Sequence, residues 1–160
     1  MRNSPCTRAC SRKRLTQAEC GIKSVVFRSA LGWAGVALSE QGICRIVLPR
    51  KNKKSAEQEL ISAECGERSS VQSELRTSSG LAKAVKLLQQ YFSGEHVSFD
   101  LPLDLRYYTR FQQAVWKAAT EIPYGETRSY AWIAKRIKNS RAARAVGQAM
   151  GANPVPIIIP

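Results

Sequence analysis

The sequence predicts an α/β chain of the α+β type, in which a small antiparallel sheet with helix precedes an all-helical half. Three short apolar runs between residues 24 and 48 are separated by glycine-containing turns, which is typical of an antiparallel meander. Beyond residue 106 the apolar spacing changes to the three-to-four-residue repeat of helices, interrupted by Pro123 and Gly125. At 160 residues and 44% hydrophobic content, the chain can bury one core or two small ones.

The first 23 residues are expected to form a basic, disordered arm. They show no apolar periodicity and carry six Lys/Arg residues against one acid, Glu19. Such a charged, aperiodic segment is typical of an extended interaction tail.

The predicted strands cover Val25–Phe27, Gly35–Ser39 and Ile43–Leu48. Turns are expected between them at Leu31–Trp33 and at Glu40–Gly42, because glycine can adopt the positive φ angles that tight turns need. Pro49 is expected to end the third strand, because proline cannot donate a ladder hydrogen bond.

A polar segment follows, and residues 50–79 are expected to form a loop or a weak helix. The next helix is clearer, because its apolar positions fall near a 3.6-residue period: Leu81, Val85, Leu88 and Phe92. Ser93-Gly94 should close this helix, and Val97–Leu103 resembles another short strand.

Three helices are predicted in the second half. The first presents an apolar face of Phe111, Val115, Ala118, Ala119 and Ile122. The second has Ser129 as its N-cap and an apolar face of Tyr130, Ile133, Ala134 and Ile137. After a turn at Lys138–Ser140, with Ser140 as the expected cap, the third presents Ala142, Ala145, Val146 and Ala149. The last two helices form a helix-turn-helix candidate, although helix pairs are common.

The exposed side of the third helix combines small residues with cations. Ala143 and Gly147 would let the helix approach a ligand closely, and Arg141 and Arg144 could reach phosphate or a groove. Alternatively, the small residues only permit helix packing and Arg144 is a solvated side chain. The presence of small residues and cations together on one basic helix favours the interpretation that the helix binds a ligand.

The last residues, Asn153–Pro160, contain four apolar residues after Pro154, Val155 and Ile157–Ile159, and are expected to form a buried strand. Chain ends normally lie in polar surface segments. We therefore expect an essential segment to follow Pro160.

The net charge of +13 favours a polyanionic partner, most often nucleic acid. Solubility and a charged membrane surface are the alternatives. No apolar run is long enough to span a bilayer, and the N-terminus has no apolar signal core. A protein that is not secreted, in the cytoplasm (nucleoid) or the nucleus, is expected.

Five cysteines form an odd set without a CxxC pair: Cys6, Cys10, Cys20, Cys44 and Cys65. A disulfide framework is therefore not expected. Cys6, Cys10 and Cys20 could hold a metal ion, but the single histidine, His96, has no informative spacing, so no metal site is predicted.

Five sequence blocks stand in the order and spacing of one family: Phe111–Trp116 (FQQAVW), Ile122–Thr127 (IPYGET), Ser129-Tyr130, Arg141–Gly147 (RAARAVG) and Asn153–Pro160 (NPVPIIIP). They resemble the DNA-binding domain of the O6-alkylguanine-DNA alkyltransferases (methylated-DNA–protein-cysteine methyltransferases). The match is looser over Ser24–Leu103, which is similar to the family's ribonuclease H-like domain. After the basic arm at 1–23, the resemblance implies a ribonuclease H-like domain at 24–104 and, at 107–160, a winged-helix-like DNA-binding and alkyltransferase domain that is incomplete at its C-terminus.

The resemblance also implies a mechanism. Family members bind duplex DNA through the minor groove, rotate the damaged guanine out of the stack and transfer its O6-alkyl group irreversibly to a cysteine, without a cofactor. Tyr130 matches the tyrosine that pushes the phosphate of the target nucleotide. Arg144 matches the arginine that fills the vacated space, which suits the negative potential of the groove. For Tyr130, the competing interpretation is an ordinary core residue.

Further residues match by position. The small residues that allow minor-groove contact correspond to Ala142, Ala143 and Gly147, and backbone contacts are expected at Gln112, Asn139 and Ser140. Asn153 matches the asparagine that joins this motif to the reactive-site segment, which ends at Pro160. The turn Lys138-Asn139-Ser140 departs from the more common Gly-x-Pro.

The largest departure follows Pro160, where the family has Cys-His-Arg and, further on, a glutamate that together supply a thiolate. None of the five cysteines present has this context. Three explanations compete: a fragment or a damaged gene, a non-catalytic lesion binder, or a gene in which the next codon is UGA and encodes selenocysteine.

The sequence therefore predicts direct repair of O6-alkylguanine in double-stranded DNA by a monomer that needs no cofactor, with the acceptor after Pro160. The 160-residue chain itself is expected to be inactive in transfer. The alternatives are a non-catalytic minor-groove binding protein and a regulator that reads the major groove.

Overall fold

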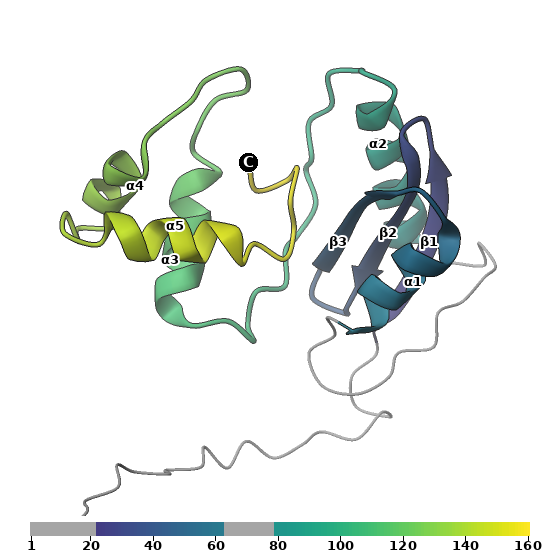
Figure 1. Ribbon diagram of the computed structural model, residues 1–160, viewed down its shortest axis with the longest axis horizontal. Coiled ribbons are helices and arrows are strands. Elements are labelled where there is room, and N and C mark those ends of the chain that lie inside the picture. Colours follow the sequence, from purple (N-terminus) through teal and green to yellow (C-terminus); the bar gives the residue numbers. More distant parts are fainter. Residues whose placement is uncertain (1–21, 63–78) are drawn as a thin grey trace, which may run out of the picture.

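The computed structural model describes residues 22–62 and 79–160, which form an antiparallel sheet with two helices and then three further helices (Figure 1). This α+β arrangement confirms the predicted fold class. The basic arm up to residue 21, the segment 63–78 and four of the cysteines (Cys6, Cys10, Cys20 and Cys65) lie outside the described residues. Within the described ranges, no helix has the length and apolar character that crossing a membrane requires.

The sheet is the predicted meander. Strands β1 (Lys23–Ser29), β2 (Gly32–Leu38) and β3 (Ile43–Arg50) pair in the order β1-β2-β3, each antiparallel to its neighbour. Gly42, in the second turn, adopts a φ of 149°, and a Cβ there would lie 2.2 Å from the carbonyl oxygen of Pro102. Only glycine allows the two segments to approach this closely.

The prediction that Pro49 ends β3 was wrong, because the strand continues to Arg50. Trp33 pairs with Arg50 and Gly35 with Val47, so two residues of β3 lie opposite one residue of β2. Pro49 therefore occupies a bulge on an edge strand, where its missing N–H group costs no ladder hydrogen bond.

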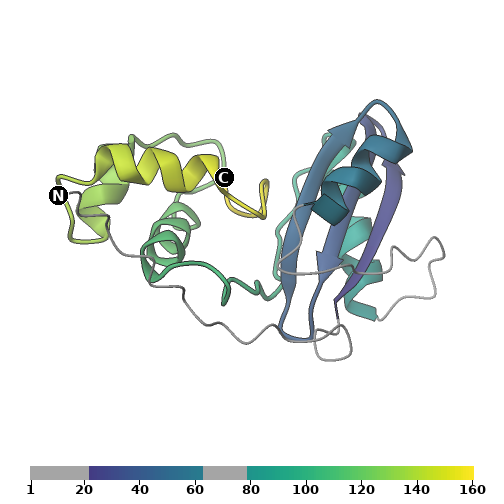
Figure 2. The same ribbon diagram turned by 60° about the horizontal axis from the view of Figure 1, so that its bottom comes forward.

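Two helices cover the sheet, one on each face (Figure 2). Alternate residues of the strands face opposite sides: Val25, Phe27 and Val36 share a core cluster with helix α2 (Ser79–Phe92), whereas Ala37 and Val47 share another with α1 (Lys53–Ser62). Helix α2 buries the four predicted apolar residues, and Gly94, at φ 87°, follows its C-terminus as expected.

The predicted strand Val97–Leu103 was also wrong. It is an extended segment that makes a single parallel bridge, from Leu103 to Ile43. The Ile43 N–H donates to the Pro102 carbonyl and the Asp104 N–H to the Ile43 carbonyl, each at 2.8 Å. A longer parallel ladder would have to pair the residues before Leu103 with the residues before Ile43. Because Ile43 is the first residue of β3, those residues form a turn and offer no strand.

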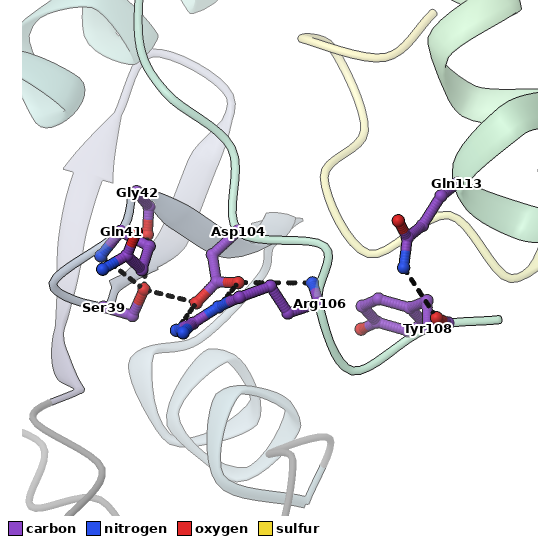
Figure 3. A network of polar contacts seen from close by, with 7 residues as sticks. All are labelled: Ser39, Gln41, Gly42, Asp104, Arg106, Tyr108 and Gln113. Carbon is purple, nitrogen blue, oxygen red and sulfur yellow. Dashed lines mark hydrogen bonds and ion pairs between the residues drawn. The ribbon is translucent and has the colours of Figure 1, made fainter. Parts of the chain in front are cut away.

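Asp104 fastens this segment to the sheet (Figure 3). Its buried carboxylate accepts hydrogen bonds from the Ser39 hydroxyl at 2.6 Å and from the Arg106 guanidinium at 2.8 and 2.9 Å. These contacts lower the pKa of Asp104 from its ordinary 3.8 to about 2. The largest cause is the hydrogen bond from Arg106, which outweighs the opposing effect of burial; Ser39 adds to the lowering.

The Asp104 carboxylate should contribute about 2 kcal/mol to stability at neutral pH, because its pKa is lower in the folded than in the unfolded state. The contribution is complete above about pH 4 and is lost as the pH falls towards about 2. Replacing Asp104 with Asn should therefore lower the free energy of unfolding at pH 7 and progressively less below pH 4. Urea titrations of both proteins across this range test the idea, and an equal loss at every pH would contradict it.

Helix α3 (Arg110–Ala119) begins the second half of the chain, at a capping box formed by Thr109 and Gln112. The Thr109 side chain accepts a hydrogen bond from the Gln112 N–H at 3.2 Å, and the Gln112 side chain accepts one from the Thr109 N–H at 3.1 Å. Val115, Ala118 and Ala119 are buried as predicted. Trp116 is fully buried as well, and its indole N–H donates to the Ala149 carbonyl at 2.9 Å.

Candidate functional site

The helix-turn-helix begins with α4 (Tyr130–Arg136), whose first turn is capped by the predicted Ser129. Its C-terminus forms a Schellman motif: the Asn139 N–H donates to the Ala134 carbonyl and the Lys138 N–H to the Lys135 carbonyl. Lys138 takes the left-handed conformation, at φ 57°, which glycine normally supplies. The turn thus keeps the glycine-type geometry without a glycine.

Helix α5 (Ala143–Gly151) starts later than predicted, and Ser140 is not its cap. The N-cap residue is Ala142, which makes no side-chain capping bond. The Ala142 N–H donates to the Asn139 carbonyl at 2.9 Å, so Ser140 and Arg141 form the middle of a turn. This turn leaves Ser140 exposed, beside the N-terminal end of α5.

Two exposed arginines lie at the start of α5 and on the turn before it, Arg144 and Arg141. Both acidic residues of α3–α5 are already engaged, Glu121 with Arg136 at 2.7 Å and Glu126 with Arg128. Arg141 and Arg144 are exposed, and neither has an ion pair or hydrogen bond with any other side chain in residues 22–62 and 79–160. These two guanidinium groups are therefore uncompensated and available to an anion.

Tyr130 is not a core residue, because its side chain is 51% exposed. It stands on the first turn of α4, and the edge of its ring lies against Gly147 of α5. Ile133 and Ala134 of the same predicted apolar face are buried. The aromatic ring is thus presented at the surface where α4 meets α5.

The expected strand at Asn153–Pro160 is wrong; this segment folds into a compact turn with one isolated bridge, between Pro156 and Ile159. The Asn153 carboxamide closes it, because its oxygen accepts from the Val155 N–H and its nitrogen donates to the Ile159 carbonyl, each at 2.9 Å. Ile157 has a φ of 79°, which is strained for a β-branched residue.

A groove of about 590 Å³ lies between this turn and the sheet. Tyr130, Asn153 and Pro160 line it, together with Met150, Gly151 and the isoleucines of the turn. The opposite wall consists of β3 residues and Glu59 of α1: Arg45, Ile46, Leu48, Arg50 and Glu59. Arg50 donates to Glu59 at 2.6 Å, and this hydrogen bond lowers the pKa of Glu59 and raises that of Arg50.

The shape of the turn should depend on Asn153. Replacing Asn153 with Ala removes both hydrogen bonds and is expected to lower the free energy of unfolding by about 2 kcal/mol. Hydrogen exchange of the Val155 amide should accelerate at the same time. An Asn153→Asp variant retains the acceptor oxygen but not the donor N–H group. Its free energy of unfolding should lie between those of the parent and of Asn153→Ala. An unchanged unfolding midpoint with a protected Val155 amide would show that packing alone holds the turn.

The structure thus brings together only some of the residues predicted for the site. Tyr130, Asn153 and Pro160 share the groove, and Gly147 contacts Tyr130. The remaining predicted residues lie on the first part of α5, on the preceding turn and on the cap of α3: Ala142, Ala143, Arg144, Asn139, Ser140 and Gln112. Sequence reasoning missed Arg45, Arg50 and Glu59, because nothing local to β3 or α1 indicates that they face a turn a hundred residues away.

No group of His, Cys, Asp and Glu side chains within the described ranges is arranged to hold a metal ion. Cys44 is a partly buried thiol on β3 that forms no disulfide within the described residues, and its Sγ donates a hydrogen bond to the Ala37 carbonyl at 3.4 Å. Cys44 packs against the core cluster that contains Ala56 and Leu60 of α1, and it does not line the groove that contains Pro160.

Two family models match the chain. The 6-O-methylguanine DNA methyltransferase ribonuclease-like domain matches residues 22–105, and the DNA-binding domain with the same family description matches residues 110–160. Among curated proteins, a methylated-DNA–protein-cysteine methyltransferase of Mycobacterium tuberculosis is 60% identical over 77 residues, or 48% of this chain and 46% of the relative. The constitutive enzyme of that name from Bacillus subtilis is 52% identical over 80 residues, or 50% of this chain and 48% of the relative.

Solved structures agree with these matches. The O6-methylguanine methyltransferase of Mycobacterium tuberculosis superposes with a TM-score of 0.64 at 36% identity, covering 87% of this chain and 75% of that one. The M. tuberculosis OGT solved in complex with DNA gives a TM-score of 0.64 at 37% identity over 86% and 74% of the two chains. The matched segment spans about half the length of the curated relatives.

Proposed function

The chain belongs to the 6-O-methylguanine DNA methyltransferase family, and from this premise we propose that it takes part in direct repair of O6-alkylguanine in double-stranded DNA. The alkyl group would pass irreversibly to a cysteine or selenocysteine that follows Pro160. The protein would act as a monomer wherever the cell keeps its DNA, in the nucleoid or the nucleus.

The observation that carries this proposal is the groove between Tyr130 and the turn closed by Asn153. Its volume, about 590 Å³, lies in the range of clefts that bind small molecules. Tyr130 and Pro160 both line it, so a base rotated past the tyrosine would arrive beside the residue that follows Pro160. Proximity of this kind is what transfer between two bound groups requires.

Tyr130 and Arg144 would extrude the damaged nucleotide. Extrusion costs a few kcal/mol of stacking and pairing. The exposed ring of Tyr130 would press on the phosphate of the target nucleotide, and the uncompensated guanidinium of Arg144 would enter the space left in the duplex. Ala142, Ala143 and Gly147 would allow α5 to approach the minor groove, with backbone contacts at Gln112, Asn139 and Ser140.

The transfer itself is a displacement at the alkyl carbon. A thiolate or selenolate attacks this carbon and forms a new bond to sulfur or selenium, while the bond between the carbon and guanine O6 breaks. The electron pair of that bond returns to the guanine, which takes up one proton and is restored. The acceptor remains alkylated, and no cofactor is consumed.

A second candidate is a lesion-binding protein without transfer activity. Its binding surface would be the same: the exposed ring of Tyr130 beside Gly147, and the exposed cations Arg141 and Arg144. Binding to O6-methylguanine duplexes without loss of the methyl group would distinguish this candidate.

The test compares the 160-residue polypeptide with a longer product of the native gene, in which translation continues past the codon that follows Pro160. Each is mixed with a duplex that contains one O6-methylguanine or only guanine. Both polypeptides should prefer the damaged duplex, but only the longer product should gain the mass of one methyl group while the lesion becomes guanine. A UGA codon followed in frame by His-Arg codons would identify the acceptor as selenocysteine.

Two outcomes would contradict the proposal. Equal, weak binding of both duplexes would remove the repair function. Methylation of the 160-residue polypeptide would show that one of its own cysteines is the acceptor, and a Cys44→Ser variant would establish whether it is the one in the sheet.

A further inference from the structure

The orientation of Tyr130 must be fixed by packing. The side chain is half-exposed on the first turn of a seven-residue helix, and its hydroxyl group has no hydrogen-bond partner in the part of the chain that the structure describes. A residue that presses on a phosphate needs a defined starting position, because small displacements of a reacting group lower rates strongly. A neighbouring residue that packs against the ring can supply this position.

That neighbour is Gly147, on the second turn of α5. A Cβ built at Gly147 would lie 3.1 Å from Cε2 and 3.2 Å from Cδ2 of the Tyr130 ring. Such distances are shorter than normal carbon–carbon contacts, so the ring edge occupies the place that a side chain at this position would take. Gly151, one turn further along α5, provides a contrast, because a Cβ there would meet no atom within 4 Å.

We propose that Gly147 is a positioning residue for Tyr130: the absence of a side chain at 147 seats the tyrosine ring against the α5 backbone and sets its position for nucleotide extrusion. This inference rests on the proposed function and goes beyond it, because the family resemblance gives Gly147 only the role of letting DNA approach. Any side chain at 147 would push the ring outwards by a few tenths of an ångström.

The two roles of Gly147 make different predictions, which a double-mutant cycle separates. The variants are Gly147→Ala, Tyr130→Ala and the combination of both. Each is measured for affinity towards an undamaged duplex and for extrusion, the latter as the fluorescence rise of a 2-aminopurine placed at the target position. Neither measurement needs the alkyl acceptor, so the 160-residue chain can be used.

If Gly147 seats Tyr130, Gly147→Ala should reduce the extrusion signal, measured with the duplex saturated by protein, about fivefold. In the Tyr130→Ala background the same substitution should leave the extrusion signal at saturation unchanged, because the ring is gone. The inference is overturned if Gly147→Ala weakens extrusion at saturation equally with and without Tyr130, since the added methyl group would then act only by obstructing the DNA.

A measurement on the free protein separates failure of this inference from failure of the proposed function. Nuclear Overhauser effects between the Gly147 α-protons and the Tyr130 ring protons should be strong without DNA. If they are present but the parent chain binds no duplex, the contact stands and the proposed function fails. If they are absent while duplex binding and extrusion are normal, the seating of Tyr130 is wrong and the proposed function remains.

Discussion

Replacing Trp116 with Ala is expected to lower the free energy of unfolding by about 3–5 kcal/mol, the usual cost of deleting a buried aromatic side chain. Trp116 is fully buried, and its ring meets that of Tyr108 edge-to-face at 4.8 Å between centroids. Its indole N–H also donates to the Ala149 carbonyl, so the same side chain holds α3 against the end of α5. A loss of this size is a large fraction of the stability of a typical domain.

The matched control is Trp116→Phe, which retains an aromatic ring and removes the indole N–H. The Ala149 carbonyl would still accept the Ala152 N–H at 3.2 Å, so a smaller loss, about 1–2 kcal/mol, is expected. Urea unfolding followed by circular dichroism measures both variants. If Trp116→Ala and Trp116→Phe both prove as stable as the parent, the contact between α3 and α5 does not depend on this side chain.

Replacing Arg144 with Ala is expected to reduce the preference for a duplex containing O6-methylguanine by about 10- to 100-fold, because the extruded base would leave a space that nothing fills. Arg144 is exposed and has no partner in the described residues, so its removal should not disturb the fold. Fluorescence anisotropy with damaged and undamaged duplexes measures the preference directly.

Two further substitutions separate the roles of charge and shape. Arg144→Lys retains the cation and should recover binding of undamaged DNA but only part of the preference for the lesion. Arg141→Ala removes a neighbouring exposed cation and should weaken binding to both duplexes alike, with a salt dependence reduced by about one unit of slope. If Arg141→Ala and Arg144→Ala behave identically, Arg144 is an ordinary phosphate contact.

Local patterns in the sequence predicted most of the secondary structure. The glycine-containing turns predicted the meander, and the apolar spacing of Leu81–Phe92 predicted α2. The errors arose where tertiary context decides. Val97–Leu103 alternates as a strand does but finds no ladder beyond Ile43, and Pro49 is accommodated by a bulge.

The last segment shows the same limit. Its isoleucines suggested a strand, but the side chain of Asn153 bonds two backbone groups and bends the run into a turn. The site residues came from resemblance to a family rather than from spacing. Residues contributed by the first half of the chain, such as Arg45 and Glu59, could not be assigned, because only the folded chain brings β3 and α1 to the groove.

The turn at the end of the chain also bears on solubility. β3 lies at the edge of the sheet, and an open edge is where strands of separate molecules join and aggregate. Here the Ile46 N–H donates to the Pro154 carbonyl at 2.9 Å, the polar groups of Ile43 are taken by Pro102 and Asp104, and Pro49 has no N–H to offer. A substitution that loosens the turn should therefore expose this edge, and self-association on storage should increase with protein concentration.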